Sequence, residues 1–481
     1  MTERLARLPL AGDAILLLAG GLLTLLFVQA TVTMGPAVPV GGLLALFALA
    51  ALVISFVATP HVAVAAIIPL FAFLPMVKTL WVPTAGPIKE VVAAGAFCAV
   101  AVLAIERHRI RTRAPVDLVA AACILGLLLL YVVNIGGGFK GESYGIAWFH
   151  GVRLIAEPLL LLLVGLCVQR PQRVFRWAMG SLVATSFVVA LYGIAQQIIG
   201  PSGLVSLGYT WDVQIQVVAS QLRSFGTLDD PFLYAAFLLF GLTAVLFWMR
   251  RGPLALFIGT TLAVGIVCGF VRTSAVIAVA LVGIWLAAQR RPVPAAFVLA
   301  AAIIAAGVVV VSSSSATESR TVQAGDMYLT LNGRTDAWHV ALGGPIDWPF
   351  GRGVGEVGTA AERATFDISR TAEEARNSRV ESVDSGYFAT IADVGFVGLA
   401  LLLVLLARLV IAATGLVRLG LVTGRVALGL LAVLMLDALT RSSFQGFPTA
   451  FVGFLLIGVA LAAGANERAE LEQRGGAPAA A

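Results

Sequence analysis

The chain is short of charged residues and of cysteines, and each shortage excludes a class of protein. Charged residues make up 12% of the 481 residues, hydrophobic residues make up 59%, and the mean hydropathy is +0.97. A soluble protein of this length needs far more polar surface, so a soluble fold is excluded. The four cysteines occur singly within apolar runs and form no CxxC pair, which excludes a disulfide framework and indicates a packing role.

Metal-binding patterns and lysines are scarce as well. No spacing of histidine, cysteine or carboxylate residues is typical of a zinc or iron site, so we expect no metal and no cofactor. Only three of the 32 basic residues are lysines. The arginines mostly occupy short segments between apolar runs, where membrane topology requires positive charge, so they do not indicate nucleic-acid binding.

Long apolar runs are what the chain has in abundance. Runs of about 18–23 residues match the ~30 Å hydrocarbon core of a bilayer and predict an all-α fold, a polytopic transmembrane helix bundle. The first run is expected to be a span and not a cleavable signal peptide. The expected spans number about fourteen: 13–33, 38–58, 61–80, 88–105, 115–135, 150–168, 177–199, 231–249, 254–271, 273–288, 294–312, 388–411, 426–442 and 447–464.

The arginine-rich segments orient this bundle. They precede the first span, follow the last, and occupy the connections at 106–113, 169–176, 250–252, 289–291 and 408–425. With fourteen spans all of them fall on one side, which the positive-inside rule assigns to the cytoplasm together with both termini. We therefore expect eleven spans within residues 1–312, a large extracytoplasmic loop with short helices at 313–387, three spans within 388–464, and a cytoplasmic tail at 465–481.

Three arginines lie beside apolar runs on the predicted extracytoplasmic side: Arg223, Arg272 and Arg334. Each alone fits an interfacial side chain that reaches toward water. Together they are a set of permanent positive charges on the face that carries the large loop. Guanidinium groups bind phosphate through two parallel hydrogen bonds, so the set suits a pyrophosphate whose lipid tail stays in the bilayer.

Other charged residues within the predicted spans either serve the function, the default for ionisable groups in a membrane, or pair with a neighbour. Arg153 and Glu157 stand four residues apart, as do Asp437 and Arg441, and opposite charges at this spacing can neutralise each other on one helix face. Asp393 lies about one turn into a predicted span, where we expect it to cap the helix or to pair with a neighbour.

Four segments, in order, resemble the O-antigen ligase and Wzy-type polymerase superfamily, a GT-C-like group of membrane glycosyltransferases. Arg223 with DDPFLYAAF (229–237) is similar to an R…NPN-type element that enters a span. VRTSAVIAV (271–279) is similar to an SR-x-A hairpin. NGRTDAWHVAL…PFGRGVG (332–355) is similar to the GR…W…P…G-x-G start of the family's large loop. VDSGYFATIADVGFVGLALL (383–402) is similar to the H/D-N-x-Y-L…E-x-G-x-x-G segment that returns to the membrane.

The chain departs from the family pattern at several positions. Asp230 replaces the usual asparagine, and Arg272 precedes the serine of its hairpin. Ligases that act on lipid A core carry a histidine where this chain has Asp384, and Ser385 replaces the following asparagine. These departures favour a polymerase, or a ligase that uses another acceptor.

The resemblance implies an activity and its partners. It implies glycosyl transfer from an undecaprenyl-pyrophosphate-linked glycan to a hydroxyl group on a glycan or glycolipid acceptor, with inversion and without a metal. It also implies a multi-pass protein of the bacterial inner membrane, in contact with membrane lipids, whose active site is extracytoplasmic. Asp229 and Asp230 are no metal-binding pair on this interpretation, because they precede a proline and indicate a turn or a helix cap.

The pyrophosphate leaving group needs positive charge, and the acceptor hydroxyl needs a base. Arg272 and Arg334 are the candidates for holding the pyrophosphate, with help from Arg223. Asp384 is the first candidate base and Glu381 the second. Asp384 has an alternative role as the N-cap of the returning helix.

Further residues are candidates for binding substrate: Trp338, His339, Arg352 and Tyr387. The aromatic side chains either stack on sugar rings or belong to an ordinary interfacial belt. His339 either contacts substrate or packs within a helix. The glycines around Arg352 in GRGVG either let the backbone approach a phosphate or sugar closely, or form a plain turn.

Two other classes of function remain open. A transporter or flippase would place charged or broken helices at the bilayer midplane and would show repeated halves, and the sequence shows no repeat. A non-catalytic scaffold of a polysaccharide-export complex is the other alternative.

Overall fold

The computed structural model describes residues 52–56, 58–82, 85–106, 118–135, 142–211, 214–218, 221–288, 349–356, 360–361 and 385–475, and these are mostly helical. The helices are α3 (Pro60–Leu80), α4 (Ile88–Glu106), α5 (Leu118–Val133), α6 (Glu142–Cys167), α7 (Pro171–Ser206), α8 (Pro231–Phe247), α9 (Pro253–Cys268), α10 (Arg272–Ala288), α15 (Gly386–Arg418), α16 (Val422–Asp437) and α17 (Thr449–Gly475). The predicted helical fold is therefore confirmed. One feature was not predicted: strands β1 (Gln216–Val218) and β2 (Gln221–Arg223) form an antiparallel hairpin with Gln216 opposite Arg223.

Several of these helices suit a bilayer. Within the described residues, five helices are long and apolar enough to cross a membrane: α3, α6, α7, α15 and α17. α5, α8, α9 and α10 are shorter apolar helices. The expected spans at 13–33 and 294–312, most of that at 38–58, and most of the loop at 313–387 lie outside the described residues. The number of fourteen spans therefore stays a prediction.

The centre of the bundle is the contact between α6 and α17. The apolar part of α17 is almost wholly buried. Gly165 of α6 and Gly458 of α17 face each other, because a Cβ atom on either would meet backbone atoms of the opposite helix. Small residues at such a crossing let two helix backbones approach closely, which maximises van der Waals contact inside a membrane.

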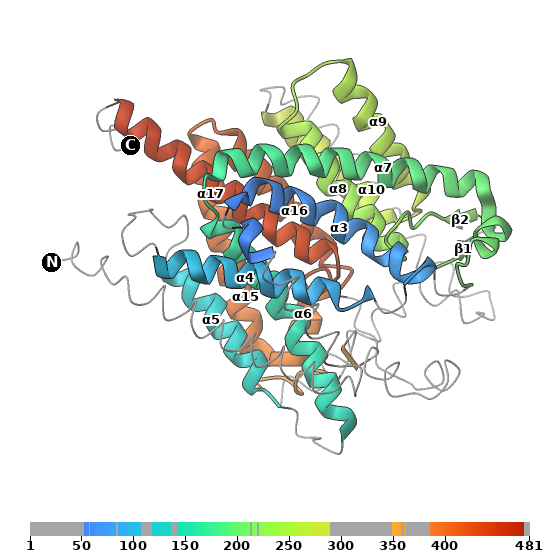
Figure 1. The fold of residues 1–481 in the computed structure, drawn as a ribbon, viewed down its shortest axis with the longest axis horizontal. Coiled ribbons are helices and arrows are strands. Elements are labelled where there is room, and N and C mark those ends of the chain that lie inside the picture. The colour runs from blue at the N-terminus through green and yellow to red at the C-terminus, as the bar shows by residue number, and fades with distance from the viewer. Residues whose placement is uncertain are drawn as a thin grey trace.

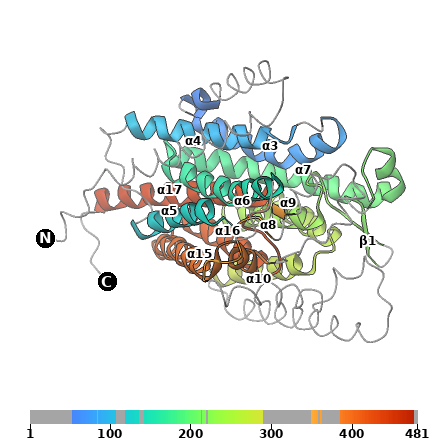
Figure 2. The same cartoon turned by 90° about the horizontal axis from the view of Figure 1, so that it is seen from below.

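The remaining helices form layers around this pair. α3 packs against α7, and α15 packs against both α5 and α16. Figure 1 labels these helices, and Figure 2 shows α3 and α4 on one side of α17, with α15 and α10 on the other. α8 lies between α7 and α16, which it contacts on either side.

One end of the bundle gathers the connections that were expected on the extracytoplasmic side. At this end, called the loop end, α3, α5, α7, α9 and α16 finish and α4, α6, α8, α10, α15 and α17 begin. Contacts join the connections to one another. Thr79 donates to Asp229 (2.6 Å), and the Ser224 amide donates to the Cys268 carbonyl (2.9 Å). The Lys89 ammonium lies 5.0 Å from the centre of the Phe447 ring. The alternation of the described helices thus brings the described residues of several connections to one end: 81–82, 85–87, 207–211, 214–218, 221–230, 269–271 and 438–448.

Candidate functional site

Two arginines from distant parts of the chain meet around one aromatic ring at the loop end. Arg223 comes from β2, and Arg441 follows α16. The guanidinium carbon of Arg223 lies 4.4 Å from the centre of the Phe232 ring, and that of Arg441 lies 4.9 Å from it. Arg223 is only 5% exposed, and the side chain of Arg441 is 14% exposed. An aromatic face attracts a desolvated cation, so Phe232 holds both guanidiniums in place.

Two carboxylates lie beside Arg441, whereas Arg223 Nη1 donates to Gln216 Oε1 (3.2 Å). Asp230 is the N-cap of α8, and its Oδ1 accepts from the amides of Phe232 (2.7 Å) and Leu233 (2.9 Å). The same oxygen lies 3.8 Å from Arg441 Nη2. Asp437, which is buried at the end of α16, lies 3.4 Å from Arg441 Nη1. The predicted pairing of Asp437 with Arg441 and the predicted helix-cap role of Asp230 are confirmed.

The charges within this cluster cancel. Arg223 and Arg441 carry two positive charges, and Asp230 and Asp437 carry two negative ones. The cluster is largely buried except for Asp230, whose side chain is 38% exposed. A charge-balanced cluster of this kind fixes side chains in place, and it binds an anion strongly only when another cation contributes. The cluster therefore positions side chains, and strong anion binding at it requires a further arginine.

The start of α15 is fastened beside Arg441. The Gly386 amide donates to the carbonyls of Arg441 (2.7 Å) and Ala438 (2.9 Å), and Ser385 Oγ donates to the Ala438 carbonyl (3.0 Å). Ser385, not Asp384, is the N-cap residue of α15. The side chain of Ser385 makes no capping hydrogen bond. Asp384 lies outside the described residues, so its alternative roles as base and as helix cap both stay predictions.

Tyr387 lies in the same contact, where it joins α15 to α16. Its hydroxyl donates to the Met435 carbonyl (3.1 Å), and its ring packs edge-on against Phe444 with 5.2 Å between the ring centres. The side chain is partly buried. This geometry supports a packing role for Tyr387 rather than the predicted stacking on a sugar.

Arg272 opens α10 at the loop end, close in the fold to the strand that carries Arg223. The link between them is the hydrogen bond from the Ser224 amide to the Cys268 carbonyl at the end of α9. Gln197 of α7 reinforces it, since its Nε2 donates to the Cys268 carbonyl (3.2 Å) and to Ser224 Oγ (2.7 Å). Arg272 itself is exposed, in contrast to the buried Arg223. The structure thus brings two of the three predicted arginines to one end of the bundle.

The described part of the large loop is a short segment, Pro349–Glu356, that packs against two helices. Asn134 Nδ2 at the end of α5 donates to the Phe350 carbonyl (2.7 Å), and the Arg352 amide donates to the Ala392 carbonyl (2.8 Å). The Val354 amide donates to the Asn134 carbonyl (3.1 Å). The segment is therefore held through its backbone, by hydrogen bonds to α15 and to both the side chain and the carbonyl of Asn134, which follows α5.

The glycines of this segment are required by the packing. Gly351, Gly353 and Gly355 have φ values of +81°, +122° and +85°, which side-chain-bearing residues rarely adopt. A Cβ at Gly351 would meet the backbone of α15, and a Cβ at Gly355 would meet the backbone of α6 at Ala147. The structure thus supports the turn interpretation of GRGVG, with the backbone close to helices.

The docking point on α15 is a break in the helix. Gly395 has φ +70° and ψ −168°, and a Cβ there would meet the Pro349 carbonyl. Next to it, the buried carboxylate of Asp393 accepts from the Gly355 amide (3.4 Å) and from Gln445 Nε2 (3.1 Å). The predicted pairing of Asp393 with a neighbour is confirmed, and its partners come from the loop and from the connection before α17.

A second cluster of charges lies between α4 and α6. Arg153 Nη1 lies 2.9 Å from Glu90 Oε1, and Lys89 Nζ lies 3.7 Å from the same oxygen. Arg153 Nη2 is 3.0 Å from His150 Nδ1. The ion pair that fixes Arg153 therefore crosses to the neighbouring helix, a partner that the spacing of Arg153 and Glu157 along one helix does not predict.

The remaining predicted site residues lie outside the described residues: Asp384, Glu381, Arg334, Trp338 and His339. Arg352 is described, and its backbone belongs to the docked segment. Arg441 is the main residue that the sequence-based candidate set missed. Its spacing from Asp437 was visible, but spacing alone does not distinguish a structural pair from one beside a site. Among the described residues, no group of three or more histidine, cysteine, aspartate or glutamate side chains is arranged to hold a metal ion.

Comparison with known proteins supports the resemblance. Residues 272–403 match the family described as O-antigen ligase. The match begins at Arg272 and covers three of the four segments quoted above, all but the element at Arg223. The resemblance to the O-antigen ligase and Wzy-type superfamily is therefore confirmed for this part of the chain. No curated protein matches the chain.

Proposed function

We propose that this chain is a membrane glycosyltransferase that moves a glycan from an undecaprenyl-pyrophosphate-linked donor to a hydroxyl acceptor, as a polysaccharide polymerase or ligase. The family match over residues 272–403 supports a glycan ligase or polymerase of the membrane. The observation that carries the site is the meeting of Arg223 and Arg441 around Phe232, beside the start of α15.

The proposed reaction requires stabilisation of a departing anion. The acceptor oxygen forms a bond to the anomeric carbon from the face opposite the pyrophosphate, while the bond between that carbon and the pyrophosphate oxygen breaks. Both electrons of the broken bond leave with the pyrophosphate. Arg272 and Arg334 hold this anion, because oriented guanidiniums stabilise charge that develops in the transition state. Arg223 and Arg441 set the local geometry around it.

The acceptor proton passes to a carboxylate, with Asp384 as the first candidate and Glu381 as the second. Asp384 directly precedes Ser385, which is fixed against Ala438 next to Arg441. This connection supports a base at the edge of the arginine cluster. Trp338, His339 and Arg352 remain candidates for contacts with the sugar.

The proposal includes a topology of fourteen spans with both termini in the cytoplasm, the large loop at 313–387 and the cytoplasmic tail at 465–481. The loop end then faces the extracytoplasmic side of a bacterial inner membrane, where no nucleotide sugar is available and a lipid-linked donor is the substrate at hand. The gathering of all the described longer connections at one end supports this arrangement.

The test is substitution of the arginines that meet at Phe232. Arg441→Gln and Arg223→Gln are expected to lower transfer by about 100-fold, because a small misplacement of the groups that hold the anion has an effect of this size. Arg250→Gln, at the opposite end of the bundle, is the matched control. High-molecular-mass surface glycan and the location of the lipid-linked precursor are measured. Precursor that accumulates outside supports a transferase, whereas precursor that accumulates on the cytoplasmic side supports a flippase and contradicts the proposal.

A second variant separates function from folding. Arg441→Gln leaves the buried carboxylate of Asp437 without its cation, which by itself destabilises the protein. The double variant Arg441→Gln/Asp437→Asn removes this charge imbalance. Restored thermal stability with transfer still lost supports a role for Arg441 in the reaction. Restored transfer would show that Arg441 acts only as the partner of Asp437.

A further inference from the structure

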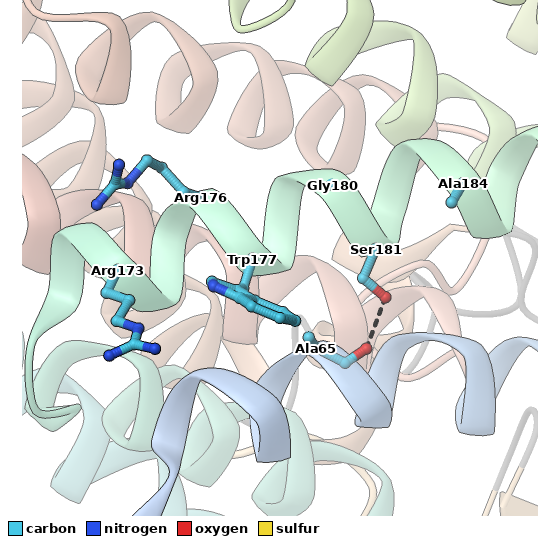
Figure 3. Close-up of a pocket in the computed structure, with 7 residues that line it drawn as sticks. All are labelled: Ala65, Arg173, Arg176, Trp177, Gly180, Ser181 and Ala184. Atoms are coloured by element: carbon cyan, nitrogen blue, oxygen red, sulfur yellow. Dashed lines mark hydrogen bonds between the residues drawn. The ribbon is translucent and has the colours of Figure 1, made fainter.

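A groove lies between α3 and α7, at the end of the bundle opposite the proposed catalytic site. It has a volume of about 630 Å³, within the range of roughly 300–1,000 Å³ that is typical of small-molecule sites. Its lining consists of Ala65 from α3 and of Arg173, Arg176, Trp177, Gly180, Ser181 and Ala184 from α7. Figure 3 shows Arg173, Trp177 and Ser181 on the side of α7 that faces α3, whereas Arg176, one turn after Arg173, points away from α3 in this view.

The groove has a charged end and an uncharged floor. α7 begins at Pro171, so Arg173 and Arg176 lie in its first two turns. Gly180, Ser181 and Ala184 follow along the helix, and their small side chains leave space beside α3. Eleven residues separate Arg173 from Ala184, which corresponds to about 16 Å at 1.5 Å per residue. Ser181 Oγ donates to the Ala65 carbonyl (2.6 Å), so the only hydroxyl of the floor is already used within the protein.

The positive charge at this end is not balanced by the described part of the chain. Within it, neither Arg173 nor Arg176 forms an ion pair with a carboxylate, and the first turn of α7 holds no acidic residue. Both side chains are exposed. The positive end of the helix dipole adds to the charge of the two arginines, so an anion is favoured here.

The dimensions and polarity of the groove select an amphiphilic anion. A soluble anion would use the arginines and leave the uncharged floor in contact with lipid. An anionic phospholipid uses both parts, because its phosphate meets the guanidiniums while an acyl chain lies over Gly180 and Ala184. Trp177 is 51% exposed between the two parts, the position that an indole ring prefers at the boundary of headgroups and hydrocarbon. Basic pockets between membrane helices are a recurrent means of binding such headgroups.

We propose that this groove binds one anionic phospholipid, with its phosphate at Arg173 and Arg176 and one acyl chain along the floor between α7 and α3. The lipid belongs to the leaflet at this end, which is the cytoplasmic leaflet in the proposed topology. Bound there, it bridges α3 to α7 at a distance from the catalytic chemistry. The inference does not depend on the proposed reaction, since lipid binding is measured without glycan substrates.

The test measures retained lipid on the full-length protein. The purified chain in detergent is titrated with phosphatidylglycerol, and bound lipid is counted by native mass spectrometry, with phosphatidylcholine as the uncharged comparison. Each basic residue near an anionic lipid contributes roughly a factor of five in affinity, so Arg173→Gln/Arg176→Gln is expected to weaken phosphatidylglycerol binding by about 25-fold. Arg250→Gln/Arg251→Gln removes the same charge from another connection at this end and is expected to leave the binding unchanged.

A steric variant tests the floor separately. Ala184→Leu keeps every arginine and fills the space intended for the acyl chain. It is expected to weaken binding by roughly fourfold for each methylene group that it excludes. Equal losses in the two arginine double variants would show only general surface attraction and would overturn the proposal. So would unchanged binding in Ala184→Leu, or equal affinity for phosphatidylcholine and phosphatidylglycerol.

Discussion

Asp229 and Asp230 are neighbours in the chain, yet their carboxylates have different environments. Asp230 caps α8 and reaches Arg441. Asp229 adopts a left-handed conformation (φ 60°), and its Oδ2 accepts from Thr79 Oγ1 (2.6 Å). Its other oxygen is buried and has no hydrogen-bond partner among the described residues. Asp230 therefore contributes to the site, whereas burial of the Asp229 carboxylate lowers the stability of the folded protein.

Because only the ionised form of Asp229 is destabilised by burial, the free energy of unfolding depends on pH. Burial raises the pKa of Asp229 to about 6, against the opposing effects of the Thr79 hydrogen bond and of Lys78, and Asp230 raises the pKa further. Because the pKa in the folded state lies above the value of about 3.9 expected for the unfolded chain, the folded state binds more protons between these values. Stability is therefore lost as the pH rises from about 4 to about 6.

Asp229→Asn is expected to remove this loss. Asparagine tolerates the left-handed conformation and carries no charge to bury. The variant is expected to gain roughly 1–3 kcal/mol over the unaltered chain at pH 7 and much less at pH 4.5. The measurement is the difference between the two melting temperatures in detergent across this pH range. A constant difference would show that Asp229 does not titrate in this window.

The sequence predicted single residues well where the determinant is local. The N-cap role of Asp230 follows from its place before Pro231, and the pairing of Asp437 with Arg441 follows from helix spacing. The partners of Arg153 and Arg223 were not predictable. Glu90 comes from another helix than Arg153. Phe232 lies only nine residues after Arg223, but the two belong to a strand and a helix whose relative placement no periodicity encodes.

At the scale of elements, the docked segment Pro349–Glu356 determines where the large loop returns to the bundle. It rests on the break of α15 at Gly395 and on α6 at Ala147. Hydropathy predicted α15 because its apolar run is continuous in sequence. The break within it was not predicted, because a glycine in an apolar helix indicates a break only when the segment that fills the gap is known.

Gly355→Ala is expected to release this segment. The added Cβ meets the Ala147 backbone, and the φ of +85° is strained for alanine. Trypsin cleavage after Arg352 is expected to accelerate by at least about tenfold, the equivalent of ~1.4 kcal/mol, and transfer activity is expected to fall. Cleavage at this bond is followed by mass spectrometry.

The matched control for that experiment is Gly415→Ala. Gly415 lies within α15 with no atom near its Cβ position, and alanine favours a helix more than glycine does. Its cleavage after Arg352 should equal that of the unaltered chain. Unchanged cleavage in Gly355→Ala as well would show that the segment is not held by this contact.

At the scale of the whole molecule, the contact of α6 with α17 holds the bundle together. Gly458→Ala places a Cβ 2.9 Å from the Leu166 amide nitrogen and 3.0 Å from Gly165 Cα. Overpacking of this kind costs about 1–3 kcal/mol. A lower melting temperature is expected, with Gly415→Ala again as the control. Equal melting temperatures for the two variants would show that the crossing adapts without loss.

Hydropathy predicted most of the described helices but not their packing. Mean hydropathy reports only that a segment prefers lipid or a protein interior. α9 and the first part of α17 are both apolar, yet that part of α17 is buried whereas α9 is largely exposed to its surroundings. The difference lies in which partners each helix finds. The close approach at Gly165 and Gly458 needs both glycines at one crossing, and the sequence alone does not show that α6 and α17 meet.

The proposed orientation can be tested with three single cysteines. Ser202 is exposed near the end of α7, at the loop end, whereas Arg250 and Gln473 are exposed at the opposite end. α8 connects the loop end to the segment that contains Arg250.

Ser202→Cys is expected to react with a membrane-impermeant maleimide in intact spheroplasts, whereas Arg250→Cys and Gln473→Cys are expected to react only after permeabilisation. The reverse pattern would place the arginine-rich connections outside, against the positive-inside rule. Labelling of Ser202→Cys and Arg250→Cys from the same side would mean that α8 does not cross the bilayer. The connections of the loop end would then not define one face of the membrane.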